Sequence, residues 1–370
     1  MSLACQRDLF EVPRQVAYLD SAAYGLLPHA VRAAGEAGVV TKSRPWEFAA
    51  ELNEQWAERA RAAAARLIGA ATDDIAIIGS ISHGLATIMA NLTPERGSRV
   101  LRLQDEHSSI VLAVDRLAAD HGLVVDVVAR PADGDWTSAV QEAIDRPGAP
   151  PLAVAALTPL HWSDGALVNL DVLASAIRAH GAVFIVDATQ TVGAVPTDVA
   201  GLRPDFLLFP TYKWLLGPYS LAFLYAAPHR QTGRPTDGNG FNLPGGQPAV
   251  GARRFDKGER NDPVAMPMAA VGMEQIEAWG VAAIQQRLRE VTSRLAGRIV
   301  EHGWQVLPAD RRAGHILGAR RPGGLVADFI PALARAGVHV SDRLGVLRIS
   351  PHVWVDEADL DRVVAAPDLR

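Results

Sequence analysis

The sequence predicts an α/β fold in which helices cover both faces of a parallel sheet. Short segments that are apolar throughout recur at residues 75–78, 99–103, 123–128, 152–157, 183–186 and 206–209. Ala-rich amphipathic segments typical of helices lie between them, for example at 54–68, 110–120 and 170–180. Strands that are apolar on both sides and separated by helices are typical of a parallel sheet buried on both faces.

Two domains are predicted. The chain has 370 residues, 49% of them hydrophobic, which suffices for a large and a small domain. Residues 229–247 are rich in Gly, Pro, Asn and Thr, and this composition predicts a loop that leaves the large domain. A long helix is expected at 267–296, followed by a smaller α+β unit. We therefore assign 16–250 to the large domain, and 1–15 with 251–370 to the small domain.

Composition argues against several classes of protein. The net charge of −5 is spread along the chain without a basic stripe, so no nucleic-acid partner is expected. The first fifteen residues hold no long apolar run, so we expect neither a signal peptide nor a membrane span, and a cytoplasmic location. The single cysteine, Cys5, excludes internal disulfides and thiolate clusters. No His, Asp or Glu grouping has metal-binding spacing, so no metal is predicted.

Lysine is rare in this chain, which narrows the search for imine chemistry. Of 36 Lys and Arg residues, only Lys42, Lys213 and Lys257 are lysines, and arginine does not form imines under ordinary conditions. Lys213 follows the apolar segment 206–209 and has aromatic neighbours, which exclude water and lower the pKa of an amine. The other two lie among polar residues. Lys213 is thus the candidate Schiff-base lysine; alternatively, it extends its ammonium group from a strand end into solvent.

Asp187 ends the apolar segment 183–186. Ligands of open α/β sheets bind at the carboxyl ends of strands, and a carboxylate buried there needs a partner. The pyridine nitrogen of pyridoxal 5′-phosphate (PLP) is such a partner, because a carboxylate beside it keeps the ring protonated and able to accept electrons. The alternative is that Asp187 caps the following turn.

The segment Ser80–Gly84 follows an apolar strand and opens a predicted helix. A small-residue turn at a helix N-terminus is a potential anion site. The spacing matches neither GxGxxG nor a P-loop, so a lone phosphoryl group is expected rather than a nucleotide. The alternative is helix capping by Ser80 or Ser82.

His107 and Arg348 are two further candidates. His107 follows the strand 99–103 and could stack on a flat cofactor ring or act as an acid or base; a solvent-exposed loop position is the alternative. Arg348 lies within the apolar segment 346–349 and needs an anionic partner. That partner is either a substrate carboxylate or a carboxylate of the protein itself.

In order and spacing, these residues resemble the class V aminotransferase family, which includes the cysteine desulfurases. The similar segments are YLDSAA at 18–23, EH at 106–107, DATQTVG at 187–193, Lys213 and RISPH at 348–352. The resemblance implies PLP fold type I, with a mostly parallel seven-stranded sheet and a small α+β C-terminal domain. It also implies a homodimer in which each site is completed by the other subunit.

The resemblance assigns a role to each matching residue. Lys213 carries PLP, His107 stacks on the ring, and Arg348 binds the substrate carboxylate. The remaining cofactor contacts that it implies are Asp187 at the ring nitrogen, Gln190 at the phenolic oxygen, Ser82 and His83 at the phosphate, and Thr211 and Tyr212 beside the lysine.

Four features depart from the family's pattern. Tyr212 precedes the lysine where the family often has His, so the contacts to the phosphate and the proton are expected to differ. Arg343-Leu344-Gly345 runs almost directly into Arg348 without a cysteine, which argues against a persulfide-forming desulfurase. The loop expected to reach the neighbour's phosphate carries Glu259 and Arg260 in place of Gly-Thr, and Arg260 could take over its role. Residues 161–164 read HWSD where desulfurases place an Asn near the ring. This segment is more similar to the isopenicillin N epimerase-like and sulfoxide lyase-like branches.

The sequence therefore predicts a PLP enzyme that acts at the α-carbon of a small amino-acid substrate, with elimination of the C–S lyase kind as the expected outcome. An aminotransferase or an epimerase of the same family is the alternative. Two further alternatives are an inactive PLP-fold interaction protein and a sugar- or nucleotide-binding α/β protein without PLP.

Overall fold

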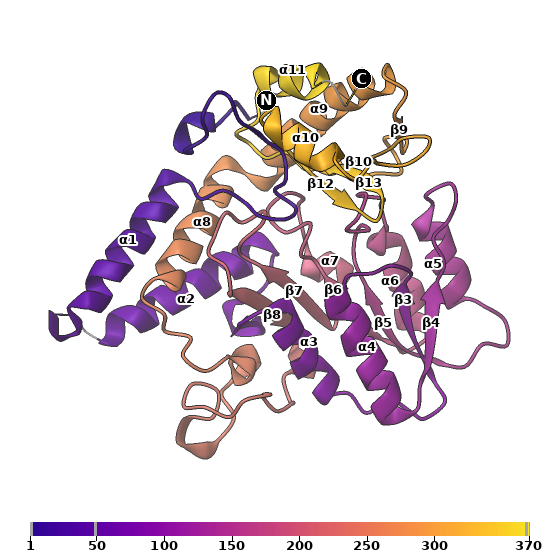
Figure 1. Ribbon diagram of the computed structural model, residues 1–370. Coiled ribbons are helices and arrows are strands. Elements are labelled where there is room, and N and C mark those ends of the chain that lie inside the picture. Colours follow the sequence, from indigo (N-terminus) through magenta and orange to yellow (C-terminus); the bar gives the residue numbers. More distant parts are fainter. Residues whose placement is uncertain (1–2, 48–49, 367–368, 370) are drawn as a thin grey trace.

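A seven-stranded sheet forms the centre of the computed structural model, which describes residues 3–47, 50–366 and 369 (Figure 1). All its strands run in one direction except β8, which is antiparallel to both of its neighbours. The strand order is β2 (Ile75–Ile78), β8 (Ala222–Ala226), β7 (Phe206–Pro210), β6 (Val183–Asp187), β5 (Leu152–Leu157), β3 (Arg99–Leu103) and β4 (Val124–Val128). The predicted α/β fold with a mostly parallel seven-stranded sheet is confirmed.

Alternate residues of each central strand enter two separate apolar cores. In β7, Leu207 and Phe209 belong to one core, and Phe206 and Leu208 belong to the other. The helices α3 (Ile81–Ala90) and α4 (Ser108–His121) cover one face. The opposite face is covered by α2 (Ala50–Leu67), α5 (Trp136–Ile144) and α6 (Leu170–Ala179). Because side chains of a strand alternate between faces, burial on both faces requires apolar residues throughout.

The predicted long helix at 267–296 consists of two helices. These are α8 (Ala265–Trp279) and α9 (Val281–Val300), and they are separated by Gly280 with φ of 79°. A positive φ cannot continue a right-handed helix, so the chain changes direction at this glycine. Helix α8 packs against α1 (His29–Ser43) and α2, whereas α9 lies in the C-terminal part of the molecule (Figure 1).

A second, antiparallel sheet forms the C-terminal part. Its order is β12 (Ser341–Arg343), β13 (Val346–Ile349), β10 (Leu317–Arg320) and β9 (Gln305–Val306), with α9, α10 (Phe329–Arg335) and α11 (Glu357–Ala365) around it (Figure 1). The N-terminal strand β1 (Ala17–Tyr18) pairs in parallel with β11 (Val338–His339). Hydrogen bonds from Ser21 N to Ser350 O and from Ser350 N to Leu19 O extend this contact. Residues 17–21 are therefore bonded along the C-terminal part of the chain.

Among the described residues, no helix is both long and apolar enough to cross a membrane.

Candidate active site

A cavity of about 330 Å³ lies at the carboxyl ends of β2, β3, β5, β6 and β7. A second hollow of about 670 Å³ adjoins it, shares Lys213 and His107 with it, and reaches β12 and β13. Six of the predicted site residues line the cavity: Ser82, His107, Asp187, Gln190, Tyr212 and Lys213. Arg348 lines the adjoining hollow. The structure therefore brings these seven residues together, although they span more than two thirds of the chain.

Lys213 lies three residues beyond β7, with its side chain 8% exposed. Burial lowers the pKa of its amine from 10.5 to about 8, and the charge of Arg348 acts in the same direction. The Nζ atom lies 5.4 Å from the centre of the Tyr212 ring, and it donates no hydrogen bond within the described chain. Gly25 packs so closely on the backbone of this turn that a Cβ atom there would lie 2.0 Å from Lys213 O. The turn is thus fixed while the amine stays free to react.

Asp187 is the last residue of β6 and is 6% exposed. Its Oδ1 accepts a hydrogen bond of 2.9 Å from Thr189 N, so it does cap the following turn. Its Oδ2 has no hydrogen-bond partner in the described part of the chain. The Oγ1 of Thr189 is buried without a partner, and both residues line the cavity. Polar atoms left open in this way are suited to a ligand with its own polar groups.

Gln190 is held by two other parts of the chain. Its Oε1 accepts a 2.9 Å bond from Trp214 Nε1, and its Nε2 donates a 3.1 Å bond to Ala22 O. The Nε2 of His315 lies 2.6 Å from the backbone oxygen of Gln190. One amide hydrogen of the side chain remains for a ligand, because an amide nitrogen carries two. The side chain is therefore oriented before any ligand arrives.

Glu106 is a buried carboxyl group of the cavity to which the sequence analysis gave no role of its own. Its Oε1 accepts a 2.8 Å bond from His107 N, and its Oε2 accepts a 2.9 Å bond from Thr158 Oγ1. Burial raises the pKa of Glu106 from 4.5 to about 7, and the charge of Asp187 adds to this effect. Its position just after an apolar strand, next to a candidate histidine, was the sequence signal for it.

His107 caps the first turn of α4, where its Nδ1 accepts a 3.3 Å bond from Ser109 N. Its ring meets the Trp162 ring edge-on, with 5.8 Å between the ring centres. Burial lowers the pKa of His107, and the nearby Lys213 ammonium acts in the same direction. A neutral aromatic ring at the cavity wall is therefore favoured over an imidazolium.

The N-terminus of α3 forms one end of the cavity, which residues 79–82 line. Ser80 accepts a 3.1 Å bond from His83 N, so the capping interpretation holds for Ser80. Ser82 instead donates a 3.2 Å bond to Ser109 Oγ, across the first turns of α3 and α4. First-turn N–H groups of a helix lack intrahelical partners and attract anions.

Two predicted cofactor contacts line neither hollow. His83 accepts a 3.2 Å bond from Gly79 N through Nδ1, and its Nε2 lies 3.6 Å from Asp237. Thr211 is fully buried, with its hydroxyl 2.5 Å from Pro218 O and 3.1 Å from Leu221 O. In this structure both residues support the cavity walls.

Arg348 forms an ion pair within the chain, which is one of its two predicted environments, and it also lines the adjoining hollow. Its Nη2 donates a 3.3 Å bond to Asp20 Oδ1, and its Nη1 donates a 3.0 Å bond to Trp162 O. Its Nε is buried without a partner, and the side chain is 2% exposed. Burial lowers the pKa of Arg348 to about 10, against the opposing charge of Asp20. An ion pair within the chain thus holds the guanidinium at the wall of the hollow.

The segment 161–164 divides between the site and a structural cluster. Trp162 lines both hollows, with its Nε1 bonded to Asp105 O at 2.8 Å. The other three side chains contact Arg130: its Nη1 lies 2.6 Å from Asp164, and its Nη2 lies 3.2 Å from both His161 and Ser163. His161 stacks on Trp136 at 5.2 Å. Only the tryptophan of this segment is therefore in a position to meet a ligand.

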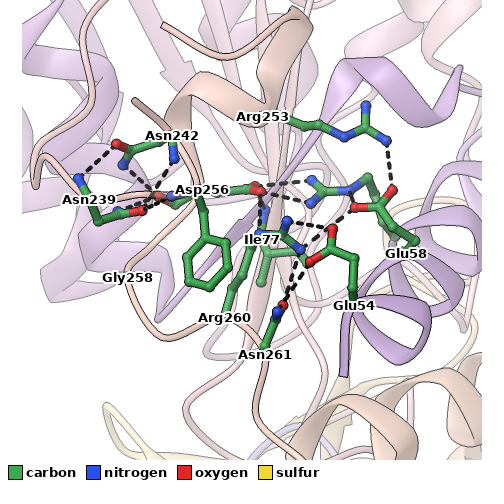
Figure 2. A network of polar contacts seen from close by, with 12 residues as sticks. Glu54, Glu58, Ile77, Asn239, Asn242, Arg253, Asp256, Gly258, Arg260 and Asn261 are labelled. Atoms are coloured by element: carbon green, nitrogen blue, oxygen red, sulfur yellow. Dashed lines mark hydrogen bonds and ion pairs between the residues drawn. The ribbon is translucent and has the colours of Figure 1, made fainter. Parts of the chain in front are cut away.

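Arg260 is buried inside its own chain, which differs from the expectation that it could reach a neighbouring subunit. Figure 2 shows it between Glu54 and Asp256, at 2.7 Å and 3.1 Å from their carboxylates. The guanidinium lies 4.7 Å from the centre of the Phe241 ring, and the residue is 5% exposed. Its charge is balanced by carboxylates of the same chain.

No group of three or more His, Cys, Asp or Glu side chains is placed to bind a metal ion within the described ranges.

Comparisons with known proteins place the chain in a family. A probable cysteine desulfurase from Pyrococcus abyssi is 28% identical over 254 residues, which are 66% of this chain and 62% of that protein. An isopenicillin N epimerase from Streptomyces clavuligerus is 25% identical, covering 84% of this chain and 83% of the relative. The solved structure of a cysteine desulfurase from Thermococcus onnurineus NA1 superposes with a TM-score of 0.86 at 22% identity, over 99% of this chain and 98% of the other. The model of the aminotransferase class-V family matches residues 17–362, so the chain belongs to this family of PLP-dependent enzymes.

Proposed function

We propose that this protein carries PLP as a Schiff base on Lys213 and acts at the α-carbon of an amino-acid substrate. The observation that carries the proposal is the buried amine of Lys213 in one cavity with Asp187. When bound, PLP supplies the electron sink that stabilises negative charge at the α-carbon.

The residues of the cavity fit this cofactor from end to end. The Oδ2 of Asp187 and the orphaned Oγ1 of Thr189 suit the polar atoms of a pyridine ring. The neutral ring of His107 suits a flat aromatic face. At the far end, the first turn of α3 with Ser82 suits a phosphate. Asp187, His107, Ser82 and Lys213 would together hold the cofactor.

Lys213 and Arg348 would have different roles toward the substrate. With a pKa near 8, a substantial fraction of Lys213 is an uncharged amine at neutral to mildly alkaline pH, as a general base requires. Arg348 would bind the substrate carboxylate, because its guanidinium is already oriented by Asp20 and Trp162. Lys213 would take the proton from the α-carbon, which Arg348 would hold in place.

Elimination of a β-substituent is the proposed outcome, of the C–S lyase kind. A desulfurase needs a thiol to accept sulfur, and the chain's single cysteine, Cys5, bonds to Trp354 O at 3.4 Å near the N-terminus. Cys5 lines neither hollow. Transamination and epimerisation remain the alternatives, because both begin with the same proton transfer to Lys213.

Lys213→Ala tests the cofactor assignment. The variant should lose the visible absorption of the cofactor–lysine linkage and at least about 100-fold in turnover, because it loses both the attachment point and the base. Lys42→Ala is the matched control, since Lys42 is exposed on α1. A Lys213→Ala protein that keeps the visible band would overturn the proposal.

Product analysis separates the outcomes. Amino acids with a β-leaving group are incubated with the holoprotein, and the products are identified by mass spectrometry. Release of the leaving group with ammonia and a 2-keto acid supports elimination. A requirement for an added 2-keto acid would indicate an aminotransferase, and inversion at the α-carbon would indicate an epimerase. A holoprotein that binds PLP but converts no amino acid would favour the interaction-protein alternative.

A further inference from the structure

A tight hairpin, residues 341–349, forms part of the wall of the second hollow. Strands β12 and β13 are antiparallel, and Arg343 pairs with Val346 across a two-residue turn. The turn residues Leu344 and Gly345 have φ of 57° and 75°, as a type I′ turn requires. A 2.8 Å bond from Gly345 N to Asp342 Oδ1 closes it. The short turn therefore fixes where Arg343 lies.

Arg343 and Arg348 lie on the same face of this hairpin. Ser341 pairs with Arg348, and Arg343 is two residues beyond Ser341 on the same strand. Because side chains alternate along a strand, Arg343 projects to the same side as Ser341 and its partner. Diagonal neighbours of this kind are about 7–8 Å apart at the backbone. Both arginines line the hollow of about 670 Å³ next to Lys213.

The charge of Arg343 is not balanced within the described chain. Its Nη1 donates a 3.3 Å bond to the backbone oxygen of Asp342, and no described carboxylate forms an ion pair with it. Arg348, by contrast, pairs with Asp20. The positive charge of Arg343 contributes to lowering the pKa of Lys213, and it acts on Arg348 in the same sense. The wall of the hollow thus carries one guanidinium more than the carboxylates that pair with it.

We infer that Arg343 binds a second carboxylate, borne by the side chain of the substrate, so that the site accepts α-amino dicarboxylic acids. This inference rests on the proposed function, in which Arg348 takes the α-carboxylate. A partly buried guanidinium that lacks an acidic partner gains most from an anionic ligand, and its planar fork suits a carboxylate. Both guanidinium groups line one hollow, which suits one molecule with two carboxylates.

Equilibrium binding of unreactive acids tests this inference. Calorimetry on the holoprotein compares succinate and glutarate with butyrate and pentanoate, which match them in length but carry one carboxylate. The wild type should bind the dicarboxylates about 10- to 100-fold more tightly, as expected for one added charge-assisted hydrogen-bond pair. Arg343→Gln should remove this preference. Arg116→Gln, which removes the same charge from an exposed position on α4, should keep it.

The inference and the proposed function fail in different ways. The visible absorption of the Lys213 linkage is recorded on the same samples. A normal band without preference for dicarboxylates would overturn the inference and leave the function standing, and so would a preference that survives Arg343→Gln. A missing band would contradict the proposed function, whereas the binding preference would still be measured, because the calorimetry requires no turnover.

Discussion

Two groups of buried charges in this protein differ in how completely their bonds are satisfied. The first, shown in Figure 2, joins the loop before α8 to α2 and β2, with Asp256 at its centre. Asp256 accepts bonds from Arg61 at 3.0 Å and 2.7 Å and from Ile77 N at 2.8 Å, while Arg260 Nε lies 3.1 Å away. Asp256 and Arg61 are fully buried.

Around this centre, acidic and basic groups are paired within the chain. Glu58 accepts hydrogen bonds from Arg61 at 3.0 Å and from Arg253 at 2.6 Å. Glu54 accepts one from Arg260 at 2.7 Å. The Asp256 carbonyl accepts from the side chain of Asn242 at 2.8 Å, so the loop is held through its backbone as well. Charges arranged in this way hold the fold together and leave little for a ligand to bind.

The cavity shows the opposite arrangement. Lys213 makes no hydrogen bond through Nζ in the described chain, Asp187 keeps one oxygen open, and Arg343 lacks an acidic partner. Buried groups left open are costly to the fold, so they persist where a ligand completes them. Charges that are paired within the chain therefore support the fold, whereas the unpaired charges of the cavity are suited to bind a substrate or cofactor.

Asp256→Asn should produce the largest change in stability. The substitution removes the fully buried counter-charge that Arg61 and Arg260 share and leaves them only the more exposed Glu58 and Glu54. Because breaking one side of a buried charge pair costs about 3–5 kcal/mol, the free energy of unfolding should fall by up to that amount. Urea unfolding of the cofactor-free protein measures it. Asp120→Asn is the control, because Asp120 pairs with Arg116 on the surface and should leave the unfolding midpoint unchanged. A loss below about 1 kcal/mol in Asp256→Asn would show that the network contributes little.

The sequence predicted the residues of the cavity but not those of the buried network around Asp256. Strand-end positions predicted the cavity, because Asp187 and Lys213 each follow an apolar segment and parallel strands end at the same edge. Arg61 pairs with Asp256, which lies 195 residues away in an irregular loop. A contact of this kind leaves no periodic pattern of apolar residues in the sequence.

The segment now seen as β8 was not among the apolar segments singled out, and the reversed direction of this strand cannot be read from its composition. Arg343 was noted only as part of a shortened loop, because the turn that orients it depends on φ angles at Leu344 and Gly345.

Glu106→Gln should change the pH dependence of stability. The pKa of Glu106 rises from 4.5 to about 7 on folding, so the folded state binds more protons between these values and stability falls as pH rises through this window. Glutamine mimics the protonated acid. The variant should therefore match the wild type near pH 4.5 and exceed it at pH 8 by up to about 3 kcal/mol, at 1.36 kcal/mol per pKa unit.

Urea unfolding of cofactor-free protein from pH 4.5 to pH 8 measures this difference. Glu11→Gln provides the control, since Glu11 is 76% exposed and should give the wild-type pH profile. If Glu106→Gln runs parallel to the wild type across the whole range, the carboxyl group is ionised in the fold at all these pH values, and burial does not raise its pKa.

Backbone strain occurs beside both groups. Six non-glycine residues in the described chain have positive φ. Ser220 lines the cavity, Asp105 and Leu344 each adjoin a lining residue, and Glu259 lies next to Arg260 of the network. Such strain persists where the surroundings hold it in place, and it gathers at functional sites. Leu344 is the clearest case, because its side chain is 56% exposed and gains little from packing.

Leu344→Asn should therefore raise the free energy of unfolding by about 0.5–1 kcal/mol, since Asn adopts the left-handed conformation more readily and Asn-Gly is the preferred type I′ pair. Leu52→Asn is the comparison, because Leu52 is an exposed leucine inside α2, where Asn is the poorer helix former and a small loss is expected. Because the turn type is unchanged, Leu344→Asn should also keep the preference for dicarboxylates. A more stable variant that loses this preference would show that the strain at Leu344 helps to position Arg343, and a less stable one would show that Leu344 contributes contacts that its exposure does not suggest.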